Sequence, residues 1–568
     1  MSAASLRALR LVPLVAVAVL PLHAQQPVTP PPAPPAASGT AAPDDARLPP
    51  ADDLRAAGRI IGLELSDAEL DLMRRGVGEN LGSLQALRDD PLENSEPPAT
   101  VFSVLLPGIV PHVQPPRGEP WPQPDVSRPA QLEDLAFADI DTLGALLRSR
   151  QVTCVELTRM FLGRLHRLDE TLHAVITFMD ERALAQAARL DAELQAGHDR
   201  GPLHGIPWGA KDLLSAAGYR TTWGSAPFEQ QVIDEDAEVV RRLDAAGAVL
   251  CAKLTLGELA WGDVWFGGMT RNPWNPEQGS SGSSAGPASA VAAGALPFAI
   301  GSETLGSIVS PSARCGCSSL RPTFGRVSRR GAMALSWTMD KLGPLCRSAR
   351  DAALVFAAIQ GPDPLDETTA QAALPYAPPG RVDVTGWRVG YVPASFPDGA
   401  PEGAVLAELR ALGVELVPVE LPQAPLEPLL VILGAEAAEA FDRLTLDGLD
   451  DQMARQVDQA WPNVFRTSRL IPAVEYLRAQ RLRRRLMLDM DKVMGGVDAL
   501  VHPSDEDVPL IIGNLTGHPT VCAPSGFRED GTPRSMSFTG RLFDEARLLA
   551  LVQAWQAGTD YHRRHPRI

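Results

Sequence analysis

The chain has 568 residues, of which 45% are hydrophobic and 21% are charged, proportions close to those of globular proteins. This composition excludes a disordered chain, a collagen and a coiled coil, and six cysteines in a chain of this length exclude a disulfide scaffold. The formal net charge of −17 disfavours a nucleic-acid partner, because affinity for a phosphate backbone depends on a concentrated set of Lys and Arg side chains. The basic residues are almost all arginines, and the four lysines are Lys211, Lys253, Lys341 and Lys492.

Residues 1–24 have the pattern of a secretory signal peptide. Arg7 and Arg10 form a basic start, Leu11 to Leu22 is an apolar stretch too short to span a bilayer, and Ala24 is a small residue before a cleavage point. The alternatives are an uncleaved anchor and a misassigned start codon. We expect a periplasmic or secreted protein with no membrane association after cleavage.

Two proline-rich stretches flank a short helical segment. Residues 25–50 predict an extended linker, residues 51–90 a helical extension, and residues 91–131 a connector that wraps over a surface without regular structure. Ser66 and Glu69 have the spacing of a capping box at a helix start. Gly76 and Gly78 weaken this helix and predict a break.

Residues 132–568 predict one large α/β domain. Another capping box, Thr153 with Glu156, opens a helix, and a second helix is expected over about 180–196. Short apolar strands at 205–210, 248–252 and 296–300 alternate with helices at 236–246 and 285–293. This alternation predicts a single mixed sheet covered by helices on both faces. The segment from about 360 to 500 is expected to supply much of a substrate pocket.

Lys211 directly follows the predicted strand at 205–210. A structural ion pair, for example with Asp212, is one interpretation. However, a chain that uses arginine at almost every basic position has little compositional reason to place a lysine here. A desolvated lysine can become a neutral base, whereas an arginine in a protein cannot lose its proton. Lys211 is therefore a candidate for proton transfer.

A run of small residues, 279–286, precedes the predicted helix at 285–293. It could be a flexible linker, or a turn that offers free N–H groups to an anion. A P-loop is excluded because no Gly-Lys-Ser/Thr follows. Residues 282–286 match the nucleophile-elbow pattern, but that motif requires a preceding strand, and 272–276 predicts a turn.

A third segment, 301–308, follows the predicted strand at 296–300. A strand, a Gly-rich turn and then a serine is a geometry that exposes a hydroxyl beside consecutive backbone N–H groups. A serine nucleophile with an oxyanion hole needs this arrangement. Alone the signal is weak, because Gly/Ser turns after strands are common.

Together these segments resemble the amidase signature family. The matching residues are Gly205–Pro207, Lys211–Asp212, Ser281–Gly294, Gly301–Gly316, Leu320–Thr323, Gly325–Ser328 and Asn514–Pro519. The resemblance covers the chain from about residue 132 to the C-terminus and implies a hydrolase of linear amides without a metal or cofactor.

The resemblance also implies a Ser–Ser–Lys triad. Lys211 would be the base, Ser283 a bridging serine that follows a cis peptide bond, and Ser307 the nucleophile. The two serines are 24 positions apart, as in the family. The backbone N–H groups of Thr304, Leu305, Gly306 and Ser307 would form the oxyanion hole.

Several positions depart from the family pattern without removing a triad member. Leu305 replaces the first of two usual glycines, and it is expected to restrict the turn and reshape the pocket. Val309 replaces a usual arginine, for which Arg314 is a candidate substitute, and Glu303 stands where aspartate is usual. Ser281 and Ala285 replace glycines of the small-residue run.

The leading hypothesis is an exported serine hydrolase that cleaves a carboxamide C–N bond through an acyl-enzyme. One alternative is the amide-transferring subunit of a tRNA-dependent amidotransferase, and another is a non-catalytic binding protein with the same fold. Cys315 and Cys317 fit neither zinc nor redox spacing and are expected to be buried thiols. The partner is expected to be a small amide; the sequence reveals neither its identity nor the oligomeric state.

Overall fold

The computed structural model describes residues 48–108, 111, 113, 115–116, 118–369 and 374–568. The predicted signal peptide and nearly all of the predicted linker therefore lie outside the described residues. The chain divides into two compact units, one up to Asp90 and one from Pro91 to Ile568. Each unit is described separately below.

The first unit is a pair of helices, α1 (Ala51–Ile60) and α2 (Asp67–Arg88). The predicted capping box is present, because the Ser66 side chain accepts from the Glu69 N–H and the Glu69 carboxylate accepts from the Ser66 N–H. The predicted break at Gly76 and Gly78 is wrong, since α2 is continuous across both. A glycine costs a helix only about 1 kcal/mol. The Leu48 side chain lies against Gly78, where a Cβ atom would be 3.2 Å from it.

The second unit is built on an eleven-stranded sheet in the described part of the chain, and this confirms the predicted α/β fold. In spatial order its strands are β1 (Val175–Phe178), β3 (Val249–Leu254), β2 (Pro207–Lys211), β8 (Phe298–Glu303), β10 (Lys341–Cys346), β9 (Ser318–Arg321), β14 (Thr520–Phe527), β15 (Pro533–Gly540), β13 (Ala499–Pro503), β11 (Arg388–Tyr391) and β12 (Glu415–Pro418). The sheet is mixed: β2 runs parallel to β3 and β8, whereas β10 runs antiparallel to β8 and β9.

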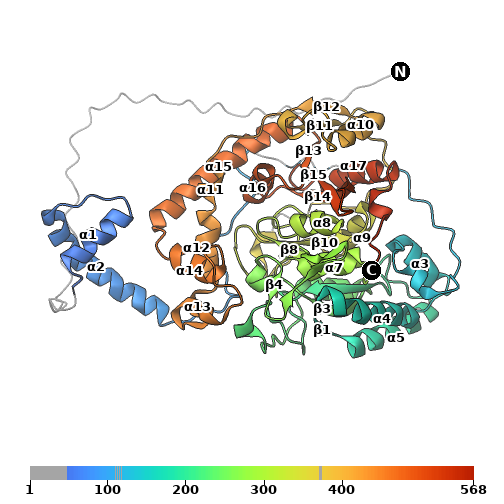
Figure 1. The fold of residues 1–568 in the computed structure, drawn as a ribbon, viewed down its shortest axis with the longest axis horizontal. Helices are drawn as coiled ribbons and strands as arrows, with labels where there is room; N and C mark the ends of the chain where they lie inside the picture. Colours follow the sequence, from blue (N-terminus) through green and yellow to red (C-terminus); the bar gives the residue numbers. More distant parts are fainter. Residues whose placement is uncertain (1–47, 109–110, 112, 114, 117, 370–373) are drawn as a thin grey trace, which may run out of the picture. The chain divides into compact units, whose positions relative to one another are not determined.

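Helices surround the sheet. They are α3 (Ile140–Arg148), α4 (Cys154–Leu172), α5 (Asp180–Gln195), α6 (Glu238–Ala245), α7 (Ala285–Ala292), α8 (Val309–Cys315), α9 (Ala349–Ile359), α10 (Gly403–Ala411), α11 (Leu426–Leu429), α12 (Val431–Ala440), α13 (Asp442–Leu446), α14 (Trp461–Ser468), α15 (Ala473–Gly495), α16 (Asp507–Thr516) and α17 (Glu545–Ala557). Figure 1 shows α4 and α5 at one end of this unit and β11, β12 and α10 at the other.

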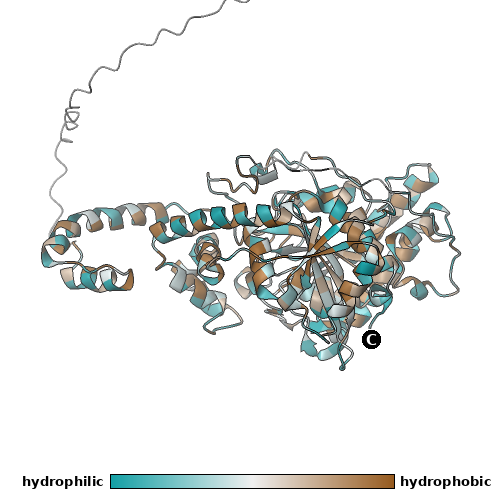
Figure 2. Cartoon of the chain, turned by 90° about the horizontal axis from the view of Figure 1, so that it is seen from above, coloured by the Kyte–Doolittle hydropathy of each residue, from teal (hydrophilic) through white to brown (hydrophobic). Residues whose placement is uncertain are grey.

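The central strands are covered by helices on both faces. Helices α7 and α8 pack against each other and against β8, β14 and β15, while α9 and α17 form a second pair against β9, β10 and β14. Every residue of β2, β3, β8 and β10 is buried, as expected for strands with two covered faces. Figure 2 shows apolar residues concentrated in the middle of the unit.

Residues 272–276, predicted as a turn, are part of a hairpin. Instead of a turn alone, the chain forms a short hairpin of β6 (Arg271–Asn272) and β7 (Asn275–Gly279), so a strand does precede the Gly/Ser run. The predicted turn is present at Pro273–Trp274, but it joins two strands. A nearby two-stranded pair is formed by β4 (Val264–Trp265) and β5 (Gly268–Met269).

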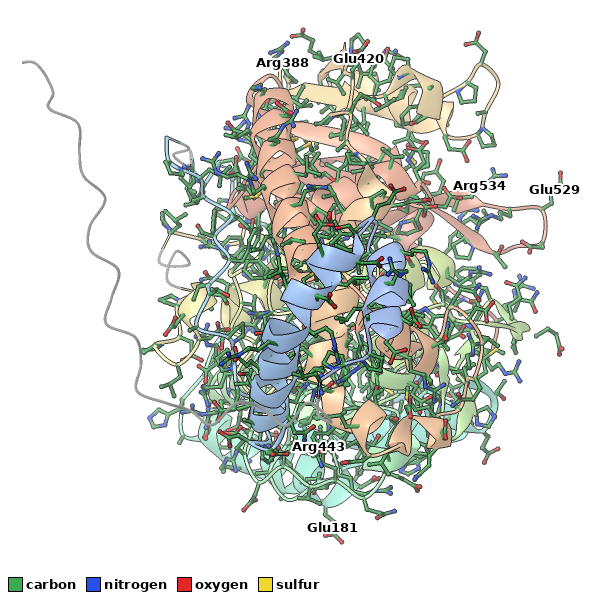
Figure 3. The ribbon with its side chains drawn as sticks, turned by 90° about the vertical axis from the view of Figure 1, so that its left-hand side faces the viewer. Glu181, Arg388, Glu420, Arg443, Glu529 and Arg534 are labelled. Atoms are coloured by element: carbon green, nitrogen blue, oxygen red, sulfur yellow. The ribbon has the colours of Figure 1, made fainter. Side chains whose placement is uncertain are left out.

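Most lysines of the chain are buried, whereas many arginines and glutamates are on the surface. All four lysines are described, and Lys211, Lys253 and Lys341 are buried, whereas Lys492 is exposed on α15. Figure 3 shows labelled arginine and glutamate side chains, such as Arg388 on β11, pointing outward from the unit. Within the described residues, the helices are too short or too polar to cross a membrane.

Candidate active site

Lys211 is the last residue of β2, the third strand from the β1 edge of the sheet. Because β2 pairs in parallel with β8, with Ala210 opposite Ile300, the end of β2 lies beside the end of β8. The neighbouring Asp212 is not the partner of Lys211. Its carboxylate is paired instead with the buried Lys253 at 2.6 Å.

The Lys211 amine lies among hydroxyl groups. Its Nζ donates to Ser283 Oγ at 2.7 Å, to Ser302 Oγ at 2.9 Å and to Ser284 Oγ at 3.2 Å. It forms no salt bridge with a carboxylate of the described residues. Burial lowers the pKa of Lys211 well below its ordinary value, and the charges of Asp340 and Glu303 oppose this shift only in part. The surroundings therefore favour a neutral amine.

Ser283 and Ser284 lie between β7 and α7. The peptide bond from Gly282 to Ser283 is cis, as the family resemblance implies. Ser284 would be the nucleophile of an elbow motif, but its side chain is buried and donates to the Ser302 carbonyl. An elbow exposes its serine, so the elbow hypothesis is excluded by the orientation of Ser284 and not by a missing strand.

Ser307 lies in the loop between β8 and α8. Its carbonyl accepts from the Ser284 N–H at 3.1 Å, which brings the two serine segments together. The residue is 8% exposed, and its hydroxyl has no hydrogen-bond partner among the described residues. The structure therefore contains the link from Lys211 to Ser283, while the hydrogen bond from Ser307 to Ser283 is not formed. Such contacts are often long in a free enzyme and tighten when substrate binds.

The loop before Ser307 presents unpaired backbone donors. The N–H groups of Leu305, Gly306 and Ser307 donate to no oxygen of the described residues. Gly306 has φ +88°, and a Cβ there would be 3.0 Å from Ser310 Oγ, so this position requires glycine. Leu305 has no positive φ, and its side chain packs against an apolar cluster that includes Met339 and Ile512. Only the second glycine position of the family pattern therefore has a backbone conformation that requires glycine.

The Glu303 carboxylate fixes the loop that carries Ser307 through hydrogen bonds. One carboxylate oxygen accepts from the N–H groups of Ile308 and Val309 at 2.8 and 2.9 Å, directly after Ser307. The other accepts from Arg321 at 2.7 Å and from Asn514 at 2.8 Å. Burial raises the pKa of Glu303, but the positive charges of Arg321 and Lys341 outweigh it and lower the pKa to about 2.

Arg321 forms a buried ion pair with Glu303. Its guanidinium also donates to the His518 carbonyl and to Thr520, so it is fixed on the far side of Glu303. The suggestion that Arg314 substitutes for the usual arginine stays a prediction. Arg314 follows the loop on the surface of α8 and donates to Gln278.

A cavity of about 600 Å³ opens beside this cluster. Ser302, Thr304, Trp337 and Asp340 are among the residues that line it. Of residues 360–500, which were expected to supply much of the substrate pocket, only Pro364–Thr368 line this cavity. Residues 94–102 of the connector and the loop around 329–337 line it instead.

Two members of the cluster were given no role in it by the sequence. Ser302 accepts from Lys211, and Asp340 accepts from the Thr304 hydroxyl at 2.5 Å and from the Leu335 and Ser336 N–H groups. The parallel pairing of β2 with β8 would have pointed to Ser302, since it places the two strand ends side by side. No local pattern marks Asp340, which follows from the antiparallel pairing of β10 with β8.

The cysteines have no catalytic environment. All six are described, buried and free of disulfides. Burial raises the pKa of the Cys317 thiol to about 12, and its Sγ lies 3.3 Å from the Ala288 carbonyl. Cys315 and Cys317 are therefore buried thiols, as expected.

Comparisons with known proteins place this geometry in a family. The Amidase family model matches residues 156–549. A glutamyl-tRNA(Gln) amidotransferase subunit of Roseiflexus sp. (strain RS-1) is 36% identical over 475 residues, with 75% of this chain and 97% of the relative covered. The corresponding subunit of Thermosynechococcus vestitus is 33% identical, with 76% and 99% covered.

A comparison with solved structures supports the same family. The native peptide amidase from Stenotrophomonas maltophilia has a TM-score of 0.67 and 32% sequence identity, with 77% of this chain and 99% of that chain covered. The chain belongs to the amidase signature family, which includes both amide hydrolases and amidotransferase subunits.

Proposed function

We propose that the protein cleaves a carboxamide C–N bond with Ser307 as nucleophile, Ser283 as proton relay and Lys211 as base. The observation that carries this proposal is the environment of Lys211: a buried amine bonded to hydroxyls, with no carboxylate of the described residues beside it. Such an amine is neutral over a wider pH range than an ordinary lysine and can accept a proton.

The reaction begins when substrate brings Ser307 into contact with Ser283. Lys211 takes the Ser283 proton, Ser283 takes the Ser307 proton, and Ser307 Oγ bonds to the amide carbon. The resulting oxyanion accepts from the N–H groups of residues 304–307. Each such donor contributes roughly 3–4 kcal/mol in other hydrolases.

The intermediate collapses when the proton held by Lys211 returns through Ser283 to the leaving nitrogen. The C–N bond breaks, ammonia or an amine leaves, and an ester to Ser307 remains. Water, deprotonated along the same relay, adds to this ester and releases the acid, which restores the free Ser307 hydroxyl.

A fluorophosphonate probe tests the nucleophile. We expect covalent labelling that peptide mass spectrometry locates on Ser307, with none in Ser307→Ala and labelling that slows greatly in Lys211→Met. Folded wild-type protein that remains unlabelled would refute the proposal and favour a non-catalytic binding protein.

A second candidate is the amide-transferring subunit of an amidotransferase, because the curated relatives compared above carry the amidotransferase name. The two candidates differ in where the nitrogen goes. A hydrolase releases ammonia to water as a single purified chain, whereas a transfer subunit works with a second subunit and its nitrogen ends on a tRNA-bound acyl group. Ammonia release by the purified chain from peptide amides, aryl amides and glutamine separates them. Activity on glutamine alone that depends on a co-purified subunit would favour transfer.

We propose, as part of the hydrolase function, that the protein is exported. It is supported by the signal-peptide pattern of residues 1–24 and by the negative net charge, which suits a small amide better than a tRNA. Cell fractionation with N-terminal sequencing tests it. A cleaved form outside the cytoplasm is expected, and an intact cytoplasmic form would contradict it.

A further inference from the structure

Part of the connector, residues 94–102, lines the cavity and is here called the strap. Its first residue, Asn94, is fixed by three hydrogen bonds. The Asn94 amide nitrogen donates to the carbonyls of Ala334 at 2.9 Å and Ala440 at 3.1 Å, and the Asn94 amide oxygen accepts from the Ala334 N–H at 2.7 Å.

The other end of the strap is held by an aromatic contact. The Arg483 guanidinium lies 3.7 Å from the centre of the Phe102 ring, and Phe324 meets that ring edge-on at 5.2 Å. Between these two anchors, the side chains of Pro97, Pro98 and Val101 carry no polar atom and line the cavity. The strap therefore presents these apolar side chains to the cavity, together with the polar Ser95 and Thr100, and it is attached at both ends.

The rest of the lining combines apolar and polar side chains. The apolar ones include Leu213, Met333, Leu335, Trp337 and Leu342. The polar ones include Glu235, Arg329, Arg330, Asp340, Asp366, Glu367 and Thr368, with Ser302 and Thr304 beside the catalytic lysine. A volume of about 600 Å³ accommodates a ligand much larger than a simple aliphatic amide. Apolar walls of this size contribute binding energy only when they cover apolar surface of the ligand.

The strap lies outside residues 156–549, the part of the chain that the family model matches. The catalytic cluster and the strap are therefore separate features of the sequence, and the family assignment gives no information about the strap. A wall contributed by this chain's own extension is a specificity device that relatives without such an extension would lack.

We infer that the strap is a substrate-binding wall and that it selects amides carrying a bulky apolar group, such as arylalkyl amides. The inference rests on the proposed function, since it assigns the substrate class of the same site. The inference places the apolar group of the substrate between Val101 on the strap and Trp337 elsewhere in the lining, with the substrate carboxamide directed towards Thr304.

A measurement of ligand affinity tests the role of the strap separately from catalysis. In a Ser307→Ala background, which cannot form the acyl-enzyme, calorimetry measures the Kd of 4-phenylbutyramide and of propionamide. Adding Asn94→Ala removes the three anchoring hydrogen bonds, and adding Val101→Asp places a charge in the wall at a residue that is 47% exposed and so tolerates substitution. We expect each change to raise the Kd of 4-phenylbutyramide at least fivefold and to leave the weak binding of propionamide within twofold.

Asn463→Ala is the matched control. It removes an asparagine side chain that donates to the Asp458 carbonyl away from the cavity, and it should leave both Kd values unchanged. Unchanged 4-phenylbutyramide binding in both strap variants, or no binding to the parent protein, would overturn the inference. If strap-dependent binding occurs but wild-type Ser307 resists the fluorophosphonate, the proposed function fails and the strap assignment stands.

Discussion

The catalytic cluster and the strap differ in how the fold holds them. Lys211 and Ser302 are at the ends of adjacent buried strands, and Ser283 lies in the turn that leads into α7. The strap has no regular structure and depends on Asn94 at one end and Phe102 at the other. The cluster is thus fixed by the sheet, whereas the strap is fixed by a few side-chain contacts.

This difference separates the chemistry from its selectivity. Proton transfer requires atoms held to within a fraction of an ångström, and strands and helices provide that precision. Substrate choice requires a wall that can differ between relatives, and an extension outside the family domain provides it without disturbing the sheet. Changes in the cluster should therefore alter the rate for every amide, while changes in the strap should alter which amide binds.

The largest effect is expected from Lys211→Arg. An arginine stays protonated and cannot accept the Ser283 proton, so kcat/KM should fall by at least about 10³-fold for small and bulky amides alike. Steady-state kinetics with both substrates measures this, and circular dichroism checks the fold. Lys492→Arg, an exchange at an exposed lysine, is the control and should behave as wild type. Wild-type turnover in Lys211→Arg would refute the role of Lys211.

Glu303→Gln should weaken both stability and catalysis. It leaves Arg321 buried without its counter-charge, which typically costs about 3–5 kcal/mol. Because the pKa of Glu303 is about 2, below its ordinary value of about 4.3, its stabilising effect is complete above about pH 4.3 and is lost as pH falls towards 2. Denaturant unfolding should show a large difference from wild type at pH 7 and a smaller one at pH 3.

Glu303→Asp serves as the matched control, since it keeps the charge and loses only reach. A Glu303→Gln protein as stable as wild type at pH 7 would show that the carboxylate does not support the Ser307 loop.

Gly306→Ala tests the loop geometry with an intermediate effect. The left-handed backbone there costs about 1–2 kcal/mol for a residue with a Cβ atom, and that atom would press on Ser310. We expect kcat to fall about tenfold for all amides, in parallel with slower fluorophosphonate labelling. Leu305→Ala, at a position without positive φ, should keep kcat within a few-fold. Equal behaviour of the two variants would contradict the geometric account.

The smallest effect is a shift in pH profile. The charge of Asp340 favours protonated Lys211, so Asp340→Asn should lower the pKa of Lys211 further. Since the neutral amine is the active form, the acid limb of kcat/KM should move to lower pH, by less than about 1 unit. A shift to higher pH would contradict the assignment of this limb to Lys211.

The parts of the fold with local signals were predictable from the sequence. The capping boxes at Ser66 and Thr153 and the small-residue run before α7 marked element starts correctly. Proximity across the sheet was not predictable in the same way. That Ser302 lies beside Lys211, or that Arg321 pairs with Glu303, depends on strand order, which a linear pattern does not contain.

The cavity was the least predictable part. The composition of residues 360–500 led to the expectation that this segment would line the substrate pocket. The cavity is lined instead by part of the proline-rich connector, residues 91–131. Proline-rich composition predicts the absence of helix and strand, and it does not predict where the segment lies. Asn94 alone fixes that position at one end, and a single asparagine is no sequence signal.

The protonation state of Lys211 is the most direct test of this account, and the scarcity of lysines makes it measurable. Labelling lysine with ¹³Cε and ¹⁵Nζ gives four sets of signals, and loss of one set in Lys211→Arg assigns it. We predict a Lys211 amine that titrates well below the ordinary lysine value and is neutral where activity is highest. An ammonium group at residue 211 throughout the active pH range would contradict the mechanism.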